Sequence, residues 1–373
     1  MDASKVFSSV VTSLRFPLML LVLLIHTQPI APETLGGDHS LYIYVATLIK
    51  EVFTRVAVPA FFVFSGYYAF RGKNLEQTSV YLTETKKRIW TLVIPYFLWN
   101  LLYILATLVG ESLASRIGLA RTEAFVFSWS RLPDYFWFEC INYPLWFIRD
   151  LIVLTLIAPV THFILRVTRG YFVPIFFLLC AFVPLPFSLV GAEPRSLLFY
   201  AMGALFAIKG WDPLEKLKPL AIPSLIVWGI GTLALPCIFT ESYFRGPELP
   251  YLVCSIIVWI QLFARLVERA PKFITWLQGL NKYVFFLYAA HSILIIGFVR
   301  SLLARVPFLS ENDLGLILSY FLIAGITLFA VLGVYWVLAR GNSSHPLRPL
   351  RRSSLLAKGQ RSILLPRDTH LSL

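Results

Sequence analysis

The chain has 373 residues, of which 58% are hydrophobic and only 14% are charged, and its net charge is +13. A soluble protein carries about 25% charged residues, so the composition excludes an ordinary globular domain. Apolar runs recur along the chain, and many reach the ~20 residues that a helix needs to cross a bilayer. These runs do not alternate polar and apolar positions as membrane β-strands do. We therefore expect an all-α, polytopic membrane protein.

We expect about ten transmembrane helices, with both ends of the chain in the cytoplasm. The predicted spans lie near residues 9–29, 45–70, 89–110, 144–165, 171–190, 196–209, 219–238, 249–266, 283–303 and 314–339. On this topology 22 of the 33 Lys and Arg residues fall in cytoplasmic segments and seven in outer loops. Positive charge concentrates in this way on the cytoplasmic side of membrane proteins. The first run lacks a good cleavage site, so we expect a retained helix rather than a signal peptide.

The sequence divides into an integral-membrane domain over residues 1–340 and a basic tail over residues 341–373. The tail mixes Arg, Ser and Pro with few aromatics, so we expect it to be disordered and to lie near anionic lipid headgroups in the cytoplasm. The outer segment 111–143 is expected to form a short interfacial helix or a lid. Because the positive charge follows bilayer topology, no nucleic-acid partner is expected. The cysteines show no C-x-x-C spacing and predict no metal or redox site: Cys140, Cys180, Cys237 and Cys254.

The first predicted span, "SLRFPLMLLVLLIHTQP", keeps two ionisable residues, Arg15 and His26. Ionisable groups in a span cost about 2.5–3.5 kcal/mol each on insertion scales, so they usually face a cavity and serve a function. Eleven residues of helix separate the two by roughly 16 Å along the axis and return nearly to the same face. They can therefore line one cavity. The alternatives are a snorkelling anchor for Arg15 and a helix-end histidine bonded to a loop carbonyl for His26.

The second span, "FTRVAVPAFFVFSGYY", places Arg55 near its outer side, one turn after Glu51, with which it can pair. The small residues Ser65 and Gly66 lie deeper in the span. Small residues in a span usually allow two helices to approach closely, so we expect this pair to be structural.

The third span follows a basic cluster, Lys86, Lys87 and Arg88, in "KKRIWTLVIPYFLWN". Cations at this mouth suit the binding of a polyanionic ligand. Simple anchoring on the cytoplasmic side explains most clusters of this kind and remains the alternative.

Two further segments carry candidate site residues. "NYPLWFIRDLIVL" places Trp146, Arg149 and Asp150 at the outer start of the fourth span, although the Trp also suits an interfacial belt and the adjacent charges can neutralise each other. "YVFFLYAAHSILI" places His291 near the middle of the ninth span, where an interface does not explain it. We therefore expect His291 to be functional.

Together these stretches resemble the membrane-bound acyltransferase-3 family over roughly residues 9–339. The spacing of Arg15 and His26 is similar to the family's first-helix signature, and "AVPAFFVFSGYY", "PLWFIRDLIVL" and "YAAH" are similar to later elements. The basic run resembles the family's Arg-x-x-Arg, but Thr91 stands where the second arginine is expected. No appended esterase-like domain is found. The resemblance implies O-acetylation of bacterial surface polysaccharides, and hence a bacterial cell membrane.

The resemblance also implies a cytoplasmic acyl-CoA donor and a hydroxyl acceptor on a saccharide or glycolipid, with no resident cofactor. Donor-binding roles fall to Arg15, Arg88 and Lys87, and the acid–base roles to His26 and His291. The ordinary pKa of histidine suits a base at neutral pH. Acceptor orientation or oxyanion stabilisation would involve Arg55, Trp146, Arg149 and Asp150.

Other functions remain open at this stage. No G-x-S-x-G elbow is present, which favours direct transfer, with an acyl-histidine as the alternative. A proton-coupled exporter would use the two histidines as a relay, but no repeat symmetry or paired broken helices support it. A lipid-embedded sensor or scaffold would need no Arg–His constellation. Release of a free thiol from acyl-CoA separates an acyltransferase from both.

Overall fold

The computed structural model describes residues 3–35, 39–73, 75, 77–116, 125–183, 185, 188, 190–238, 248–293 and 295–343. These residues form helices and no β-strand, as the all-α prediction requires. The α-helices are α1 (Ala3–His26), α2 (Ser40–Thr47), α3 (Ala57–Phe70), α4 (Thr78–Arg88), α5 (Ile94–Arg116), α6 (Trp146–Leu156), α7 (Ala158–Val167), α8 (Phe172–Phe182), α9 (Pro194–Ile208), α10 (Pro213–Leu217), α11 (Ala221–Ile238), α12 (Glu248–Arg269), α13 (Pro271–Gly279), α14 (Asn281–Ala290), α15 (Ile295–Leu303), α16 (Pro307–Ser310) and α17 (Asp313–Ser343).

Short π- and 3₁₀-helical turns join several of these helices. The π-helical turns are η2 (Leu48–Val52), η4 (Ile89–Val93) and η6 (Asp134–Phe138). The 3₁₀ turns are η1 (Pro32–Thr34), η3 (Phe53–Val56), η5 (Trp129–Arg131), η7 (Tyr143–Leu145) and η8 (Lys218–Leu220). The described part of the predicted outer segment 111–143 thus contains the end of α5, η5 and η6. The predicted tail lies outside the described residues beyond position 343.

Five helical segments among the described residues are long and apolar enough to cross a membrane, or up to seven if each bent pair is one span. Each of the ten predicted ranges falls on a helix or helix pair, but several of these helices are too short to cross a membrane on their own. The shorter apolar helices are α8 and α9. The described residues therefore support a helical membrane protein with five to seven full-length spans, and the count of ten stays a prediction.

Two of the predicted spans are broken. α6 and α7 meet at an angle of 62°. Pro159 follows the break, and because a proline has no N–H to offer the carbonyl four residues earlier, the helix cannot continue through this point. α14 and α15 meet at 72°, and His291 follows the last residue of α14. His291 therefore lies at a helix break rather than inside a straight ninth span.

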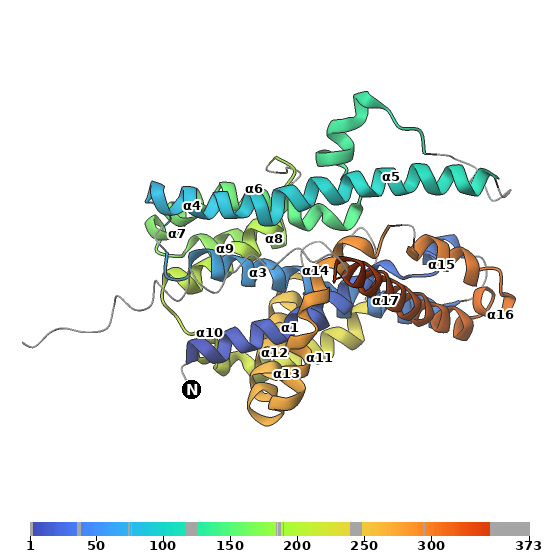
Figure 1. The fold of residues 1–373 in the computed structure, drawn as a ribbon. Helices are drawn as coiled ribbons and strands as arrows, with labels where there is room; N and C mark the ends of the chain where they lie inside the picture. The colour runs from blue at the N-terminus through green and yellow to red at the C-terminus, as the bar shows by residue number, and fades with distance from the viewer. Residues whose placement is uncertain are drawn as a thin grey trace, which may run out of the picture. The chain divides into compact units, whose positions relative to one another are not determined.

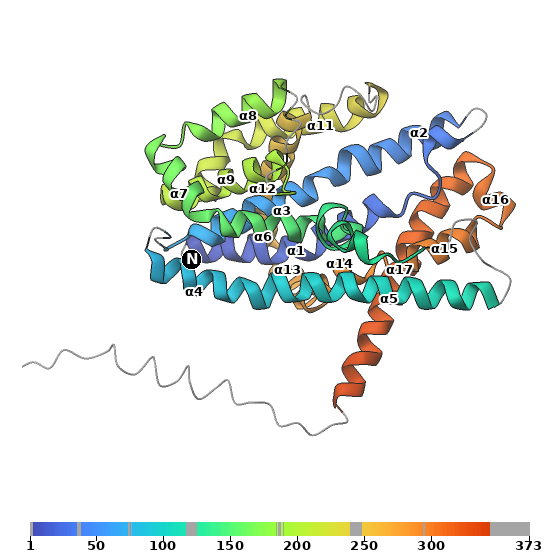
Figure 2. The same ribbon diagram turned by 90° about the horizontal axis from the view of Figure 1, so that it is seen from above.

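The chain divides into two compact units, residues 1–332 and 333–373. In the first unit α1 is central, because it contacts α3, α12, α13 and α14. Figures 1 and 2 show α5 running along the outside of these helices in both views. Within the second unit, the last turns of α17 place Arg340 over the ring of Trp336, 3.6 Å from its centroid.

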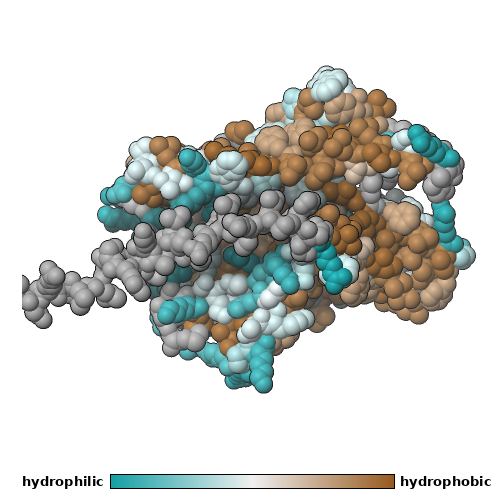
Figure 3. Space-filling model, in the orientation of Figure 1, coloured by the Kyte–Doolittle hydropathy of each residue, from teal (hydrophilic) through white to brown (hydrophobic). Residues whose placement is uncertain are grey.

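Figure 1 places the start of α1 at the same end of the first unit as α4, α7 and α10. The residues that carry positive charge here are Lys73, Lys86, Lys87, Arg88, Arg166, Arg169 and Lys216, and we call this the basic end. Figure 3 shows hydrophilic side chains around this end and hydrophobic surface over much of the rest of the same face. This separation is what the predicted clustering of Lys and Arg requires.

The most extensive helix contact among the described residues joins α3 to α9. A Cβ atom built on Gly66 would lie 2.0 Å from the carbonyl oxygen of Tyr200, and one on Gly203 would lie 1.9 Å from that of Val63. Real Cβ atoms do not approach so closely, so the two helices can touch here only through glycine. The expectation of close helix packing at Gly66 is confirmed.

We expect Gly66→Ala to destabilise the protein by about 3 kcal/mol or more, because overpacking against backbone atoms cannot be relieved by a side-chain rotation. Gly229→Ala in α11 is the matched control, because open space surrounds its Cβ position. Thermal unfolding in detergent measures the difference. Equal melting temperatures for the two variants would contradict a close α3–α9 contact.

Candidate active site

Two of the predicted site residues, His26 and His291, meet although 265 positions separate them in the chain. The centroids of their imidazole rings lie 5.3 Å apart, with an angle of 38° between the planes. His291 is fully buried, whereas His26 is half-buried. The structure thus brings the last residue of α1 to the end of α14.

His26 is positioned by groups that hold the last turn of α1. The hydroxyl of Tyr320 donates to the carbonyl oxygen of Leu24 at 2.7 Å. The guanidinium of Arg300 donates to the carbonyl oxygen of His26 at 3.0 Å. The final carbonyls of a helix have no partner within the helix, and a cation also suits this negative end of the helix dipole. Sequence reasoning missed both residues.

His291 is positioned by the segment around η7. The side-chain amide of Asn142 donates to the carbonyl of Ala289 at 3.1 Å, and Ser292 donates to the amide oxygen of Asn142 at 2.7 Å. The hydroxyl of Tyr288 donates to the carbonyl of Pro144. The segments "NYPLW" and "YAAHS" therefore dock on each other at the break after α14. Asn142 is fully buried, and sequence reasoning missed it.

A second set of contacts fixes α13 and α14 against α1. The amide of Gln278 donates to the hydroxyls of Ser9 and Ser13, at 2.9 and 3.1 Å. Asn281 donates to the carbonyl of Thr12 at 2.7 Å. These contacts lie about four to five turns before His26 on the same helix. The helices that carry the two histidines are therefore fixed to each other both near the histidines and several turns away from them.

The hydrogen bonds of His291 define its tautomer. Its Nδ1 lies 3.0 Å from the carbonyl of Leu287, and a carbonyl can only accept, so Nδ1 carries the proton. Nε2 is then the nitrogen with the free lone pair, and it is buried with no hydrogen-bond partner among the described residues. A neutral imidazole held in this way can accept a proton at one defined atom.

Tyr143 lies beside the pair and reaches the surface. Its ring meets the ring of His26 edge-on, with 6.1 Å between centroids, and its side chain is 63% exposed. The site at His26 is therefore bordered by an exposed aromatic ring, whereas His291 lies behind it. Sequence reasoning did not single out Tyr143.

The predicted donor-binding cations do not share one environment. Lys87 is exposed and pairs with Glu84 at 2.7 Å, and the same carboxylate pairs with Lys73 at 2.8 Å. Arg88 is half-buried and lines a cavity of about 20 Å³ at the basic end. Arg15 is exposed on α1, eleven residues before His26, and none of the described hydrogen bonds or ion pairs involves it. Arg88 and Arg15 thus remain available to a ligand, whereas Lys87 is already paired.

Arg55 is exposed and pairs with Glu51 one turn earlier, as the spacing predicted. Lys50 and Arg55 lie on η2 and η3, which contact α1, and Arg300 bonds to the carbonyl of His26. The structure therefore places three cations around the histidine site.

Arg149 and Asp150 are buried and pair at 3.0 Å. Arg149 also donates to the carbonyl of Trp137 at 2.9 Å, and Asp150 accepts from Ser196 of α9 at 2.6 Å. These contacts tie η6, α6 and α9 together. Trp146 is half-buried and packs against Phe62 of α3. The contacts described for these three residues are with protein groups, so their predicted role toward an acceptor stays a prediction.

Cys140 is buried beside Arg149 and lies 2.9 Å from the hydroxyl of Tyr96. Burial raises the pKa of the Cys140 thiol, so this cysteine stays protonated at neutral pH and is a poor nucleophile. In the part of the chain that the structure describes, no three His, Cys, Asp or Glu side chains gather as metal ligands would.

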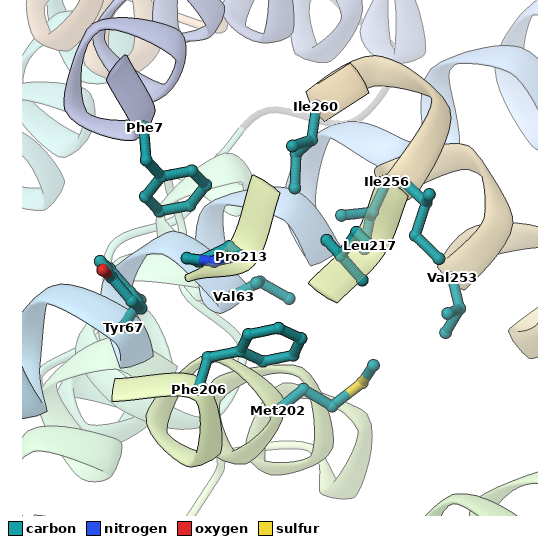
Figure 4. Close-up of a pocket in the computed structure, with 12 residues that line it drawn as sticks. Phe7, Val63, Tyr67, Met202, Phe206, Pro213, Leu217, Val253, Ile256 and Ile260 are labelled. Atoms are coloured by element: carbon teal, nitrogen blue, oxygen red, sulfur yellow. The ribbon is translucent and has the colours of Figure 1, made fainter. Parts of the chain in front are cut away.

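A larger cavity of about 60 Å³ lies between α1, α3, α9, α10 and α12. Figure 4 shows that apolar side chains from these helices surround it, with Phe7 opposite Phe206 and Met202. Because neither histidine lines it, this cavity lacks the groups for acid–base chemistry. The histidine pair is therefore the better candidate for the reaction centre.

The fold and the site define a helical membrane protein in which two histidines, one half-buried and one buried, lie side by side. The acyltransferase-3 family, whose model is described as an acyltransferase domain, matches residues 11–340. The chain therefore belongs to this family. The resemblance noted in the sequence is confirmed. The two bent helix pairs show that the expected lack of broken helices was wrong, so the case against an exporter rests on membership of this family.

The chain is also similar to the succinoglycan biosynthesis protein ExoH of Rhizobium meliloti (strain 1021). The two are 24% identical over 245 residues, which cover 64% of this chain and 61% of ExoH. The match therefore spans about three fifths of that relative. No solved structure matches the chain.

We expect Asn142→Ala to cost about 1–3 kcal/mol of stability, because it leaves the carbonyl of Ala289 and the hydroxyl of Ser292 buried without a partner. Ser301→Ala is the control, because that hydroxyl bonds within its own helix in an exposed position. Its effect should stay within about 0.5 kcal/mol. Thermal unfolding compares the two, and equal stabilities would contradict a structural role for Asn142.

Proposed function

We propose that the protein is an O-acyltransferase that moves an acyl group, most simply acetyl, from cytoplasmic acyl-CoA to a hydroxyl of a saccharide or glycolipid. The observation that carries the proposal is the meeting of His26 and His291 in a family of acyltransferases. The name of the relative ExoH supports a polysaccharide as the acceptor.

In this mechanism the acceptor hydroxyl attacks the thioester carbonyl as an imidazole takes its proton. The carbon–sulfur bond then breaks, and the CoA thiol leaves with a proton. His26 is the base, because it borders the exposed ring of Tyr143 where an acceptor can arrive. His291 is the second acid–base group, since its Nε2 is buried without a described partner and its ring lies next to that of His26. A positioned base contributes about 10²–10⁴ in rate.

The cations have two further roles, binding the donor phosphates and stabilising the oxyanion. Arg88 and Arg15 bind the phosphates of the donor, because both are free of described ion pairs. Arg55 lies on η3, which contacts α1, and it would stabilise the oxyanion on the thioester carbonyl by exchanging its ion pair with Glu51 for the oxyanion. Arg149, Asp150 and Trp146 would affect the acceptor site through the segments that they hold together.

The proposed topology has ten spans in a bacterial cell membrane, with the basic end and both termini in the cytoplasm. The concentration of Lys and Arg at that end supports this orientation. The donor would then enter beside Arg88, and the acceptor would approach from the other side or within the membrane.

We expect a cysteine at Ser79 of α4 to react only with a permeant maleimide, and one at Ser130 of η5 to react with an impermeant reagent in intact cells. Both positions are exposed. The background carries Cys237→Ser and Cys254→Ser, which removes the more accessible native thiols. Labelling of the Ser79 position by the impermeant reagent would reverse the proposed orientation.

We expect His26→Ala and His291→Ala each to lower transfer by about 10²–10⁴. Because the two rings lie 5.3 Å apart and act as one unit, the double variant should be no slower than the worse single variant. Thiol release from acetyl-CoA and the mass of the acylated exopolysaccharide measure the reaction.

His39→Gln is the control for this experiment. His39 lies in the connection between α1 and α2 and pairs with Asp313 at the start of α17, so its imidazole already has a protein partner. Its turnover should remain within about twofold of the wild-type enzyme. Near wild-type turnover by His26→Ala at saturating donor would remove His26 as the base and leave His291 as the candidate.

A further inference from the structure

Two residues that line the small cavity beside Arg88 carry buried hydroxyls, and neither hydroxyl has a hydrogen-bond partner among the residues that the structure describes. They are the phenol of Tyr200 on α9 and the hydroxyl of Thr85 on α4. Buried polar groups are nearly always hydrogen-bonded in native proteins. Two unpartnered donors at one cavity therefore indicate that something polar occupies it in the working protein.

Tyr200 forms a packed wall of the cavity, whereas α4 contributes both Arg88 and the carboxylate of Glu84, which is paired with Lys73 and Lys87. Tyr200 is 1% exposed, and its ring packs edge-on against Phe70 at 5.9 Å between centroids. Thr85 and Arg88 are three residues apart on a helix, so their side chains lie on one face. The hydroxyls and the guanidinium therefore converge from different helices. The α3–α9 contact at Gly203 lies one turn beyond Tyr200 and fixes its position.

A volume of about 20 Å³ admits one water or one oxygen atom of a larger group. We propose that Tyr200 and Thr85 donate hydrogen bonds to one phosphate oxygen of the nucleotide part of the acyl donor, while Arg88 holds the rest of that phosphate. The assignment rests on the proposed function. It adds neutral donors from α9 and α4 to the cation, which is the usual composition of a phosphate site.

The test uses Tyr200→Phe and Thr85→Val, which delete the hydroxyls and keep the shapes. Each should raise the KM for acetyl-CoA, and the Kd for free CoA, by roughly tenfold, because a hydrogen bond to a charged group is lost. The acceptor KM should not change. The melting temperature of ligand-free Tyr200→Phe should stay equal or rise, because an unpartnered buried hydroxyl is removed. A purely structural tyrosine would show the opposite pattern.

Tyr251→Phe is the matched control, because this buried phenol on α12 already bonds to Thr232 at 3.0 Å. It should lower the melting temperature and leave the affinity for CoA unchanged. Arg88→Ala reports on the donor site itself and should raise the KM for acetyl-CoA at least as much as Tyr200→Phe.

The outcomes separate the two proposals. If Arg88→Ala weakens CoA binding while Tyr200→Phe and Thr85→Val do not, the cavity holds a structural water and the inference is wrong, although the donor site stands. If none of the three variants changes CoA binding, the donor does not bind here and both proposals fail. Binding of CoA to the full-length protein in nanodiscs of neutral phosphatidylcholine gives this readout even without an acceptor.

Discussion

The positions of several helices in the first unit depend on the contact between α3 and α9. In a bilayer the lipid tails are as apolar as the helices, so helices associate through close packing rather than through the hydrophobic effect. Gly66 and Gly203 permit backbone contact, and side chains on either side of that contact reach other elements. Phe62 of α3 packs against Trp146 of α6, and Ser196 of α9 bonds to Asp150. A change in this spacing would move α6 and the cavity at the basic end together.

The histidine site follows from a second constraint, that backbone polar groups inside a membrane protein must find partners. The site lies where α1 ends and where α14 breaks. The carbonyls freed at these ends are taken by Tyr320, Arg300 and Asn142 rather than by water. The same contacts hold the two imidazole rings next to each other. Interrupted helices thus give the protein both the polar groups and the rigid positions that proton transfer requires.

Sequence reasoning identified the helical class and the two histidines because each rests on local information. Apolar runs of span length mark helices, and a mid-span histidine stands out against its neighbours. Asn142, Arg300 and Tyr200 could not be found in this way, because their roles depend on contacts with distant segments. The number of full-length spans was also hard to predict, since hydropathy alone does not report a bend such as that before Pro159.

The polar residues on and beside α1 form a series that fits the shape of the proposed donor. Arg88 lies at the basic end, Arg15 lies roughly 16 Å before His26 along α1, and the histidines lie at the far end of that helix. An unpaired cation in an apolar span is costly unless it faces water or an anion. A CoA thioester carries its phosphates far from its reactive carbonyl on a flexible arm. With its phosphates at the basic end, such a donor supplies the anion near Arg15 and leaves the uncharged thioester beside the histidines. On the proposed function, the charge that makes α1 unusual as a membrane helix is neutralised by the phosphates of the bound donor.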